Sequence, residues 1–146
     1  MSAGVKPSSA RVASLVDVRA LAAEARQTGL DHGLTPAQAE HLALVVAELG
    51  SNAVVHGRGG SVSVRVSRAG WLVEVVDRGP GFSEAVLADG GRSDALGLHG
   101  VRPRDQVGRT FGAGLASVRR LSTRLSLKNL NPGASVEAEA ELTPFR

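Results

Sequence analysis

The nine residues ELGSNAVVH at positions 48–56 decide both how this sequence folds and where its chemistry lies. Within them Glu48, Asn52 and His56 recur at every fourth position. On an α-helix each such step turns the side chain by only about 40°, so the three side chains form one stripe. A carboxylate, an amide and an imidazole on one helix edge indicate either a ligand-binding surface or a solvated flank.

The helix that carries this stripe has a complete start signal. Thr35 can cap it, Pro36 suits the first helical position, and Gln38 completes a capping box. Apolar residues then recur with helical spacing along one face. We therefore predict a helix over residues 36–56, ended by Gly57 in a left-handed conformation.

The sequence on either side of this helix predicts a single domain with the order helix, helix, hairpin, lid, helix, hairpin. Residues 1–12 have no pattern and are interpreted as a flexible leader or the start of an edge strand, with the folded domain over 13–146. The predicted elements are a helix near 17–29, a hairpin of strands 61–67 and 71–77, a glycine-rich lid within 78–111 that is weakly helical near 84–87, a helix over 112–121, and strands 125–130 and 136–142.

A second motif follows the hairpin, where Asp77 leaves an apolar strand and is succeeded by Arg78, Gly79, Pro80 and Gly81. A carboxylate at a strand end can accept a hydrogen bond from an exocyclic amine, and glycines allow a flat ring to approach the backbone. An ordinary turn is the alternative interpretation of this motif.

A third motif, Gly112-Ala113-Gly114-Leu115, opens the last predicted helix. Backbone N–H groups and the positive end of a helix favour an anion such as phosphate. The only lysines in the chain are Lys6 and Lys128, so no lysine follows the glycines and a P-loop is excluded.

Composition excludes several other classes of protein. The 146 residues contain no cysteine, so thiolate metal sites and disulfides are excluded and a metal would need oxygen or imidazole ligands. Aromatic residues are only 3% and the net charge is +3, which argues against nucleic-acid binding. No apolar run suits a membrane span or a secretory signal, so we expect a soluble cytoplasmic protein that does not bind membranes.

The three motifs, in this order and with a glycine-rich lid before the third, resemble those of the GHKL superfamily of ATP-binding domains. Residues 48–56 resemble its N box, 77–81 its first glycine box and 112–115 its second, and the similarity spans roughly residues 15–142. The resemblance implies the Bergerat fold, an α/β two-layer (α+β) sandwich. In that fold a mixed, mostly antiparallel sheet has its helices on one face, and ATP lies between the helices and the lid.

The resemblance also implies roles for individual residues, with ATP and Mg²⁺ as cofactors. Asn52 would hold Mg²⁺, Glu48 would act as the catalytic base, and Asp77 would bind the adenine amino group. The further nucleotide-binding residues implied are Gly79, Gly81, Gly112, Gly114, Leu115, His56 and Arg109. The alternative for His56 is capping of the helix end.

Within the superfamily, the chain length and the Glu-Leu form of the N box favour stand-alone anti-sigma serine/threonine kinases. That branch implies phosphorylation of a serine on a STAS-domain antagonist, with a sigma factor or a signalling phosphatase as further partners and a homodimer as the assembly. A nucleotide-gated binding module and a detached histidine-kinase catalytic domain are the alternatives. The arginine-rich lid segment 96–109 is longer than the resemblance predicts.

Overall fold

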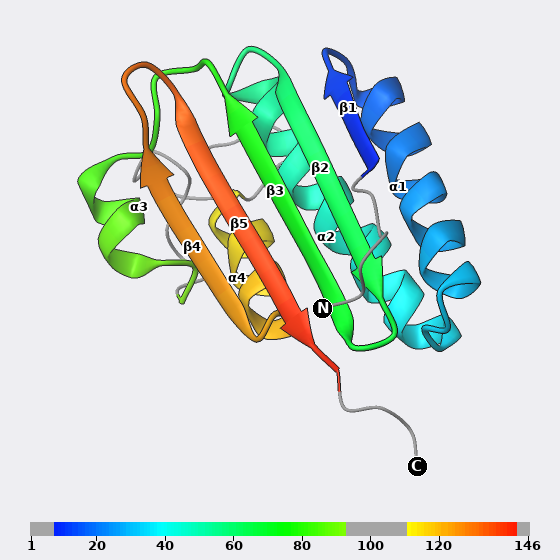
Figure 1. The fold of residues 1–146 in the computed structure, drawn as a ribbon. Helices are drawn as coiled ribbons and strands as arrows, with labels where there is room; N and C mark the ends of the chain where they lie inside the picture. Colours follow the sequence, from blue (N-terminus) through cyan, green and yellow to red (C-terminus); the bar gives the residue numbers. More distant parts are fainter. Residues whose placement is uncertain (1–7, 93–110, 143–146) are drawn as a thin grey trace.

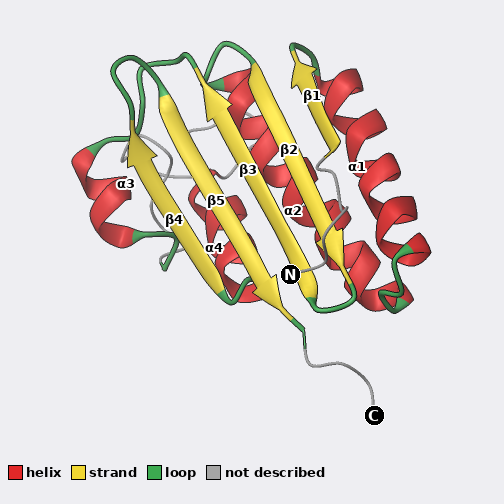
Figure 2. Cartoon of the chain, in the orientation of Figure 1, coloured by secondary structure: helices red, strands yellow, loops and turns green. Residues whose placement is uncertain are grey.

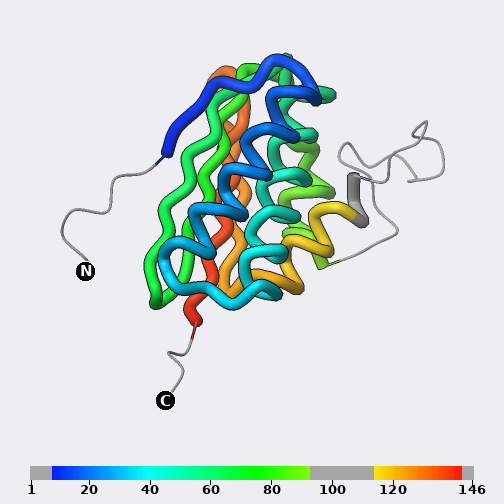
Figure 3. The backbone as a smooth tube through the Cα atoms, turned by 90° about the vertical axis from the view of Figure 1, so that its right-hand side faces the viewer, coloured from blue at the N-terminus to red at the C-terminus, as the bar shows by residue number. Residues whose placement is uncertain are grey.

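The long helix predicted from the capping signal is α2 (Pro36–Val55), and it packs against the central strands of a five-stranded sheet (Figure 1). The computed structural model describes residues 8–92 and 111–142. Seen from the side, these residues form two layers, with the sheet on one side and the helices on the other (Figure 3). The expected α+β two-layer sandwich of the Bergerat type is therefore confirmed.

The described elements follow the predicted order of two helices, a hairpin, a helix and a second hairpin, with β1 before them and the short α3 after the first hairpin (Figure 2). In chain order they are β1 (Ser8–Val12), α1 (Leu15–Asp31), α2, β2 (Gly60–Ser67), β3 (Gly70–Asp77), α3 (Glu84–Asp89), α4 (Phe111–Leu121), β4 (Arg124–Asn129) and β5 (Ala134–Glu141).

The strand order across the sheet is β1-β2-β3-β5-β4. Every pairing of these strands is antiparallel, so the parallel part of the expected mixed sheet is absent among the described strands. Short turns join β2 to β3 and β4 to β5, and a direct hairpin connection gives antiparallel neighbours. The sheet presents one face to the helices and leaves the other face open (Figure 1).

The core lies between the helices and the sheet, and alternation along the strands accounts for it. Val62, Val64 and Val66 of β2 are each at most 3% exposed. They face α2, whose apolar stripe is likewise buried. Trp71 is 4% exposed, which confirms that it is a packing residue. The core side chains contributed by α2 are Ala39, Leu42, Val45, Val46, Leu49 and Ala53.

The ends of α2 confirm one expectation and correct another. Thr35 Oγ1 accepts from the Gln38 N–H at 3.1 Å, and Gln38 Oε1 accepts from the Thr35 N–H at 2.9 Å, which completes the predicted capping box. At the other end Gly57 is not left-handed. The positive φ angles belong to Arg58 (59°) and Gly59 (86°), so position 57 needs glycine for another reason.

The structure decides between the two N-terminal alternatives for residues 8–12. Ser8–Val12 pair antiparallel with β2 as the edge strand β1, so the edge-strand alternative holds there and the flexible leader does not extend to them. Val12 is 2% exposed and anchors this strand in the core. Residues 1–7 lie outside the described part of the chain.

The predicted glycine-rich lid contains a short helix near its beginning. Ser83 caps α3 by accepting from the Val86 N–H at 3.2 Å, and Gly90 ends it in the left-handed conformation. The arginine-rich segment 96–109 lies outside the described residues. Within the described ranges, no helix has the length and hydropathy needed to cross a bilayer.

Candidate functional site

The stripe on α2 brings Glu48 to the beginning of α4. A Cβ added to Gly114 would lie only 2.5 Å from Glu48 Oε2, so the carboxylate approaches the helix backbone where glycine leaves space. Gly112 and Gly114 both occupy the first turn of α4, whose N–H groups have no acceptor inside the helix. The structure thus places an acidic side chain of one helix beside the positive end of another.

Asn52 lies one turn further along α2 and is partly buried. Its Nδ2 atom is buried and has no hydrogen-bond partner among the described residues. Because buried amide groups are nearly always hydrogen-bonded in folded proteins, this side chain is a strong candidate for a ligand contact. His56 follows as the C-cap of the helix and donates its backbone N–H to Asn52 O at 2.9 Å.

Asp77 stands at the end of β3, beside the end of α2. Its Oδ1 accepts from the Gly79 N–H at 2.9 Å. A Cβ on Gly57 would lie 2.5 Å from the Asp77 Cβ and 2.6 Å from its Oδ2. Glycine at position 57 is therefore required by the close approach of this aspartate. The sequence pattern predicts only a helix-ending role for Gly57, because its contact with Asp77 forms between distant segments.

The loop after Asp77 is tightly held by glycines and by an asparagine. A Cβ on Gly79 would lie 2.6 Å from His56 O, and one on Gly81 would lie 2.7 Å from Asn129 Oδ1. The Asn129 side chain pairs with the backbone of Phe82, accepting at 2.7 Å and donating at 2.9 Å. Asn129 thereby fastens the first glycine motif to the end of β4. No local pattern singled it out, since its partner is 47 positions away.

The other predicted site residues are placed differently. Leu115 is 2% exposed, so only its backbone is available to a ligand. The start of the lid is attached to α4, because Arg119 Nη1 donates to Gly90 O at 3.1 Å. Arg109 lies outside the described residues.

A comparison with protein families decides what kind of domain this is. A family model described as the histidine kinase-like ATPase domain matches residues 9–139, which is most of the chain. This chain belongs to the histidine kinase-like ATPase family. The expected membership of the GHKL superfamily is therefore confirmed.

The ATPase domain is similar to parts of larger sensor proteins. It is 36% identical over 102 residues to the sensor protein CseC of Streptomyces avermitilis and 37% identical over the same length to CseC of Streptomyces coelicolor. Each match covers 66% of this chain but only 19% and 18% of the two sensor proteins. The chain thus matches about a fifth of the length of these curated relatives.

Two solved structures share the fold of the ATPase domain. The SiaB–SiaC complex from Pseudomonas aeruginosa contains a chain with a TM-score of 0.61 and 15% identity, covering 90% of this chain and 88% of that one. The mycobacterial sensor histidine kinase MprB gives a TM-score of 0.55 and 17% identity, covering 96% of this chain and all of that one. At these identities the likeness establishes the shared fold.

The electrostatics of Asp77 give the ATPase domain a testable pH dependence. Burial raises the pKa of Asp77 above its usual value of 3.8, and the N–H groups of Gly79 and Ala134 oppose this rise only in part. A folded-state pKa above the unfolded one means that the folded protein binds this proton more tightly. The stability that the proton contributes is complete below about pH 3.8 and is lost as pH rises through the folded-state pKa.

We expect this pH dependence of stability to be absent from the variant Asp77→Asn. As pH rises through the window above 3.8, the free energy of unfolding of Asp77→Asn should increase relative to that of wild type, because only the wild type must bury a charge. Urea unfolding of both proteins at a series of pH values measures the difference. The changed hydrogen bonds of the amide would add an offset to the free energy of unfolding that is the same at every pH. If the difference between the two proteins consisted of this offset alone, the raised pKa of Asp77 would be contradicted.

Proposed function

We propose that this domain binds ATP with Mg²⁺ and transfers the γ-phosphoryl group to a serine hydroxyl of a partner protein, as a serine/threonine kinase of the anti-sigma type. The observation that carries the proposal is the Glu48 carboxylate at the glycine-rich start of α4. A phosphate chain bound by the N–H groups of that helix turn would lie beside a potential proton acceptor.

The adenine end of the site would be built around Asp77. Its carboxylate would accept from the exocyclic amino group, and Gly57, Gly79 and Gly81 would keep the surrounding backbone close and free of side chains. Because Asn129 and the packed glycines fix this loop, little conformational entropy would be lost on binding. The triphosphate would extend from there toward Gly112 and Gly114.

The Mg²⁺ ion would be held by the side chain of Asn52 together with phosphate oxygens. Mg²⁺ usually keeps several waters and is bound by one or two protein oxygens together with substrate phosphates. Asn52 Oδ1 would be the protein ligand of the ion, and the buried, unpartnered Asn52 Nδ2 would donate to a phosphate oxygen of the nucleotide. When bound, the ion would neutralise charge on the phosphates.

In the transfer step the serine oxygen would form a bond to the γ-phosphorus while the bond to the β–γ bridging oxygen breaks. Glu48 would take the hydroxyl proton, and ADP would leave with the bridging oxygen. Phosphoryl transfer depends mainly on positioning and on charge stabilisation. The role of this chain is therefore to hold Glu48 on a rigid helix at the correct end of the nucleotide.

The proposed partner is a STAS-domain antagonist, with a sigma factor or a signalling phosphatase as further partners and a homodimer as the assembly, all in the cytoplasm. One structure of similar fold is a two-protein complex, SiaB with SiaC, and this supports a protein partner for the domain. The partner serine would reach Glu48 at the start of α4, beside Gly114.

A detached histidine-kinase catalytic domain is the second candidate. The 36% identity with the sensor protein CseC favours it. The two candidates differ in the bond that they form, because phosphohistidine is labile to acid whereas phosphoserine survives acid and is cleaved by base. The stability of labelled product to acid and base would therefore assign the acceptor.

The first test is calorimetry of ATP and ADP binding, with and without Mg²⁺, on wild type, Asp77→Asn and Asn52→Ala. Binding that needs Asp77, and that loses its Mg²⁺ dependence without Asn52, would support the proposed site. Transfer from labelled ATP would then be assayed with a panel of purified STAS-domain proteins. No binding at millimolar nucleotide would refute the kinase. Binding without transfer to any acceptor would favour a nucleotide-gated module instead.

The variant Gly114→Ala is expected to separate catalysis from folding. The added methyl group would displace the end of the Glu48 side chain, which can rotate away, so the fold should remain intact. Because a misplacement of about 1 Å can cost on the order of 10²-fold in rate, transfer should fall by about that factor. The free energy of unfolding should be unchanged or rise by up to about 1 kcal/mol, since alanine favours helix over glycine.

The matched control for this variant is Gly29→Ala in α1. Its Cβ would approach the flexible end of Leu34, with Cδ1 at 3.0 Å, would be in ordinary contact with Ala39 at 3.5 Å and 3.6 Å, and would be far from Glu48 in the fold. Normal transfer in Gly29→Ala and slow transfer in Gly114→Ala are the expected pair of results. Normal transfer in both variants would show that the position of Glu48 does not matter.

A further inference from the structure

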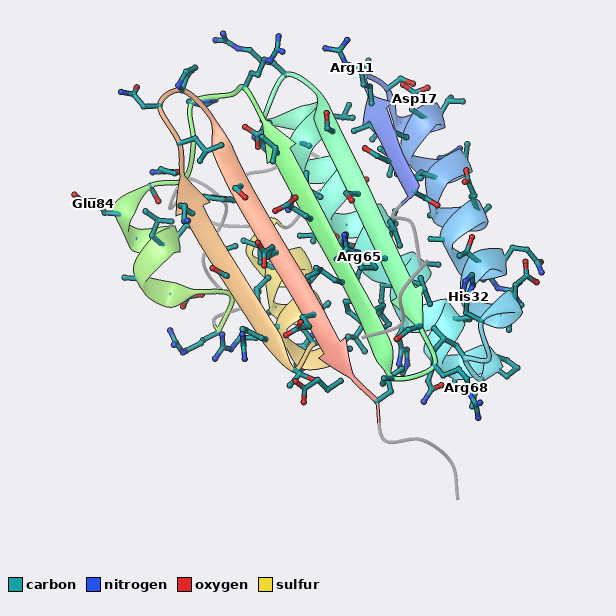
Figure 4. The ribbon with its side chains drawn as sticks, viewed as in Figure 1. Arg11, Asp17, His32, Arg65, Arg68 and Glu84 are labelled. Carbon is teal, nitrogen blue, oxygen red and sulfur yellow. The ribbon has the colours of Figure 1, made fainter. Side chains whose placement is uncertain are left out.

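Apart from the candidate site, a hollow lies at the edge of the sheet where β1 and β3 end and β2 begins. Its volume is about 430 Å³, within the range of small-molecule sites. The hollow is lined by Arg11, Val12, Ala13, Arg58, Gly59, Gly60, Ser61, Val76 and Arg78. Figure 4 shows Arg11 at this edge, at the end of β1.

The register of the strands places this hollow on the open face of the sheet. Arg11 pairs with Ser61, and Ser61 pairs with Val76, so the three form one row across β1, β2 and β3. Val76 is 37% exposed, whereas its neighbour Val75 is 2% exposed and faces the helices. The hollow is thus separate from Glu48 and Asn52, which belong to the helix layer.

The charge of the hollow is strongly one-sided. Arg11, Arg58 and Arg78 are all exposed, and within residues 8–92 and 111–142 none of them has an ion pair or a side-chain hydrogen bond. No carboxylate is among the lining residues. Three arginines line the hollow, whereas the nearby Asp17 carboxylate borders it only through its hydrogen bond from the Ala13 N–H. The lining therefore carries an excess of positive charge, which favours a multiply charged anion.

The backbone beneath these arginines is fixed. Arg58 has a positive φ of 59°, which is uncommon for a residue other than glycine. The turn is held because the Gly59 N–H donates to Ala53 O at 2.8 Å and the Arg78 N–H donates to Gly57 O at 3.3 Å. Two of the three arginines are therefore carried by anchored turns, which lowers the entropy lost when a ligand is bound.

We propose that this hollow is an anion site that binds a small molecule carrying two or more phosphate groups. Arginine forks match the geometry of phosphate oxygens, and each can form paired hydrogen bonds to them. Ser61 adds a hydroxyl donor, while Gly59 and Gly60 keep the floor of the hollow free of side chains. The hollow adjoins the adenine end of the proposed ATP site, because Arg78 lies between Asp77 and Gly79, but it is separate from Glu48 and the start of α4. Anion binding there does not depend on kinase activity.

The test is a nuclear magnetic resonance titration of the ¹⁵N-labelled chain with inorganic pyrophosphate in the absence of Mg²⁺. We expect the amide signals of Gly59, Gly60, Ser61 and Arg78 to shift together with one dissociation constant. In the triple variant Arg11→Ser, Arg58→Asn, Arg78→Ser the affinity at these signals should fall by about tenfold or more, since several charge-assisted hydrogen bonds are lost. Asparagine is chosen at position 58 because it tolerates a positive φ.

The matched control is Arg65→Ser, which removes an exposed arginine from the middle of the open face of β2 (Figure 4). It should leave the pyrophosphate affinity within about twofold, because a distant surface charge is largely screened at physiological salt. Shifts confined to Gly114 and its neighbours would place the anion in the ATP site and overturn the proposal. An equal loss in Arg65→Ser and in the triple variant would also overturn it, since binding would then reflect net charge alone. Each single variant repeats the test if the triple variant does not fold.

Discussion

Replacing Glu48 by glutamine is expected to lower the rate of phosphoryl transfer by about 10²- to 10⁴-fold, the usual contribution of a general base. Glutamine has the same length and shape and can still contact the start of α4, but it cannot take up the serine proton. Affinity for ATP should change little, because Glu48 does not contact the adenine side of the site. Single-turnover transfer from labelled ATP and calorimetry of ATP binding measure the two quantities separately.

The matched control for this variant is Glu24→Gln, which removes an exposed carboxylate from α1. It should leave both transfer and ATP binding unchanged. A normal rate in Glu48→Gln would refute the role of Glu48 as the base. A large loss of ATP affinity in Glu48→Gln would instead show that the carboxylate helps to hold the metal and nucleotide.

The elements with strong local signals were predictable from the sequence. The α2 helix begins at a capping box that Thr35 and Gln38 form within four residues of one another, and its apolar face follows from helical spacing. The valines of β2 and β3 alternate, so burial on one face fixed those strands as well. Such signals come from residues close together in the sequence, and the tertiary packing is compatible with the elements that they predict.

The sequence does not decide between an edge strand and a flexible leader at the position of β1, because the pattern of apolar residues there is short. Ser8–Val12 contains only Ala10 and Val12 as apolar positions on the helix side, and an edge strand needs a neighbour on one side alone. Its formation depends on pairing with β2, some fifty positions later in the sequence. A pairing between residues so far apart in the sequence cannot be predicted from a local pattern.

The same distinction holds within the candidate site. Glu48 and Asn52 were found because helical spacing aligns them, whereas Asn129 and Gly57 act through partners far away in the sequence. From the sequence alone, Asn129 is predicted only as a strand residue, and its hydrogen bonds with Phe82 depend on the fold. Gly57 is predicted only to end a helix, and its close approach to Asp77 depends on the position of β3. Long-range contacts of this kind require the fold itself.

Replacing Gly57 by alanine should damage both stability and nucleotide binding. The new methyl group would overlap the Cβ and carboxyl group of Asp77, which are too close to the backbone to rotate away freely. Overpacking of this kind costs about 1–3 kcal/mol in the free energy of unfolding. ATP affinity should fall by at least about tenfold, because a displaced Asp77 loses a hydrogen bond from a charged group to the adenine amine. Urea unfolding and calorimetry measure the two effects.

A double-mutant cycle identifies the cause of that damage. All three close contacts of a Cβ at position 57 are with the side chain of Asp77. Asp77→Ala removes the contacts with Cγ and Oδ2 but keeps the one with Cβ, so the overlap should be relieved in part. The double variant Gly57→Ala, Asp77→Ala should then be more stable than the sum of the single variants predicts, with a coupling of about 0.5–3 kcal/mol. Additive effects would mean that the backbone of β3 moves aside instead. In that case the absence of a side chain at position 57 would not be what positions Asp77. A strong coupling would show instead that Gly57 and Asp77 act as one structural unit of the adenine site.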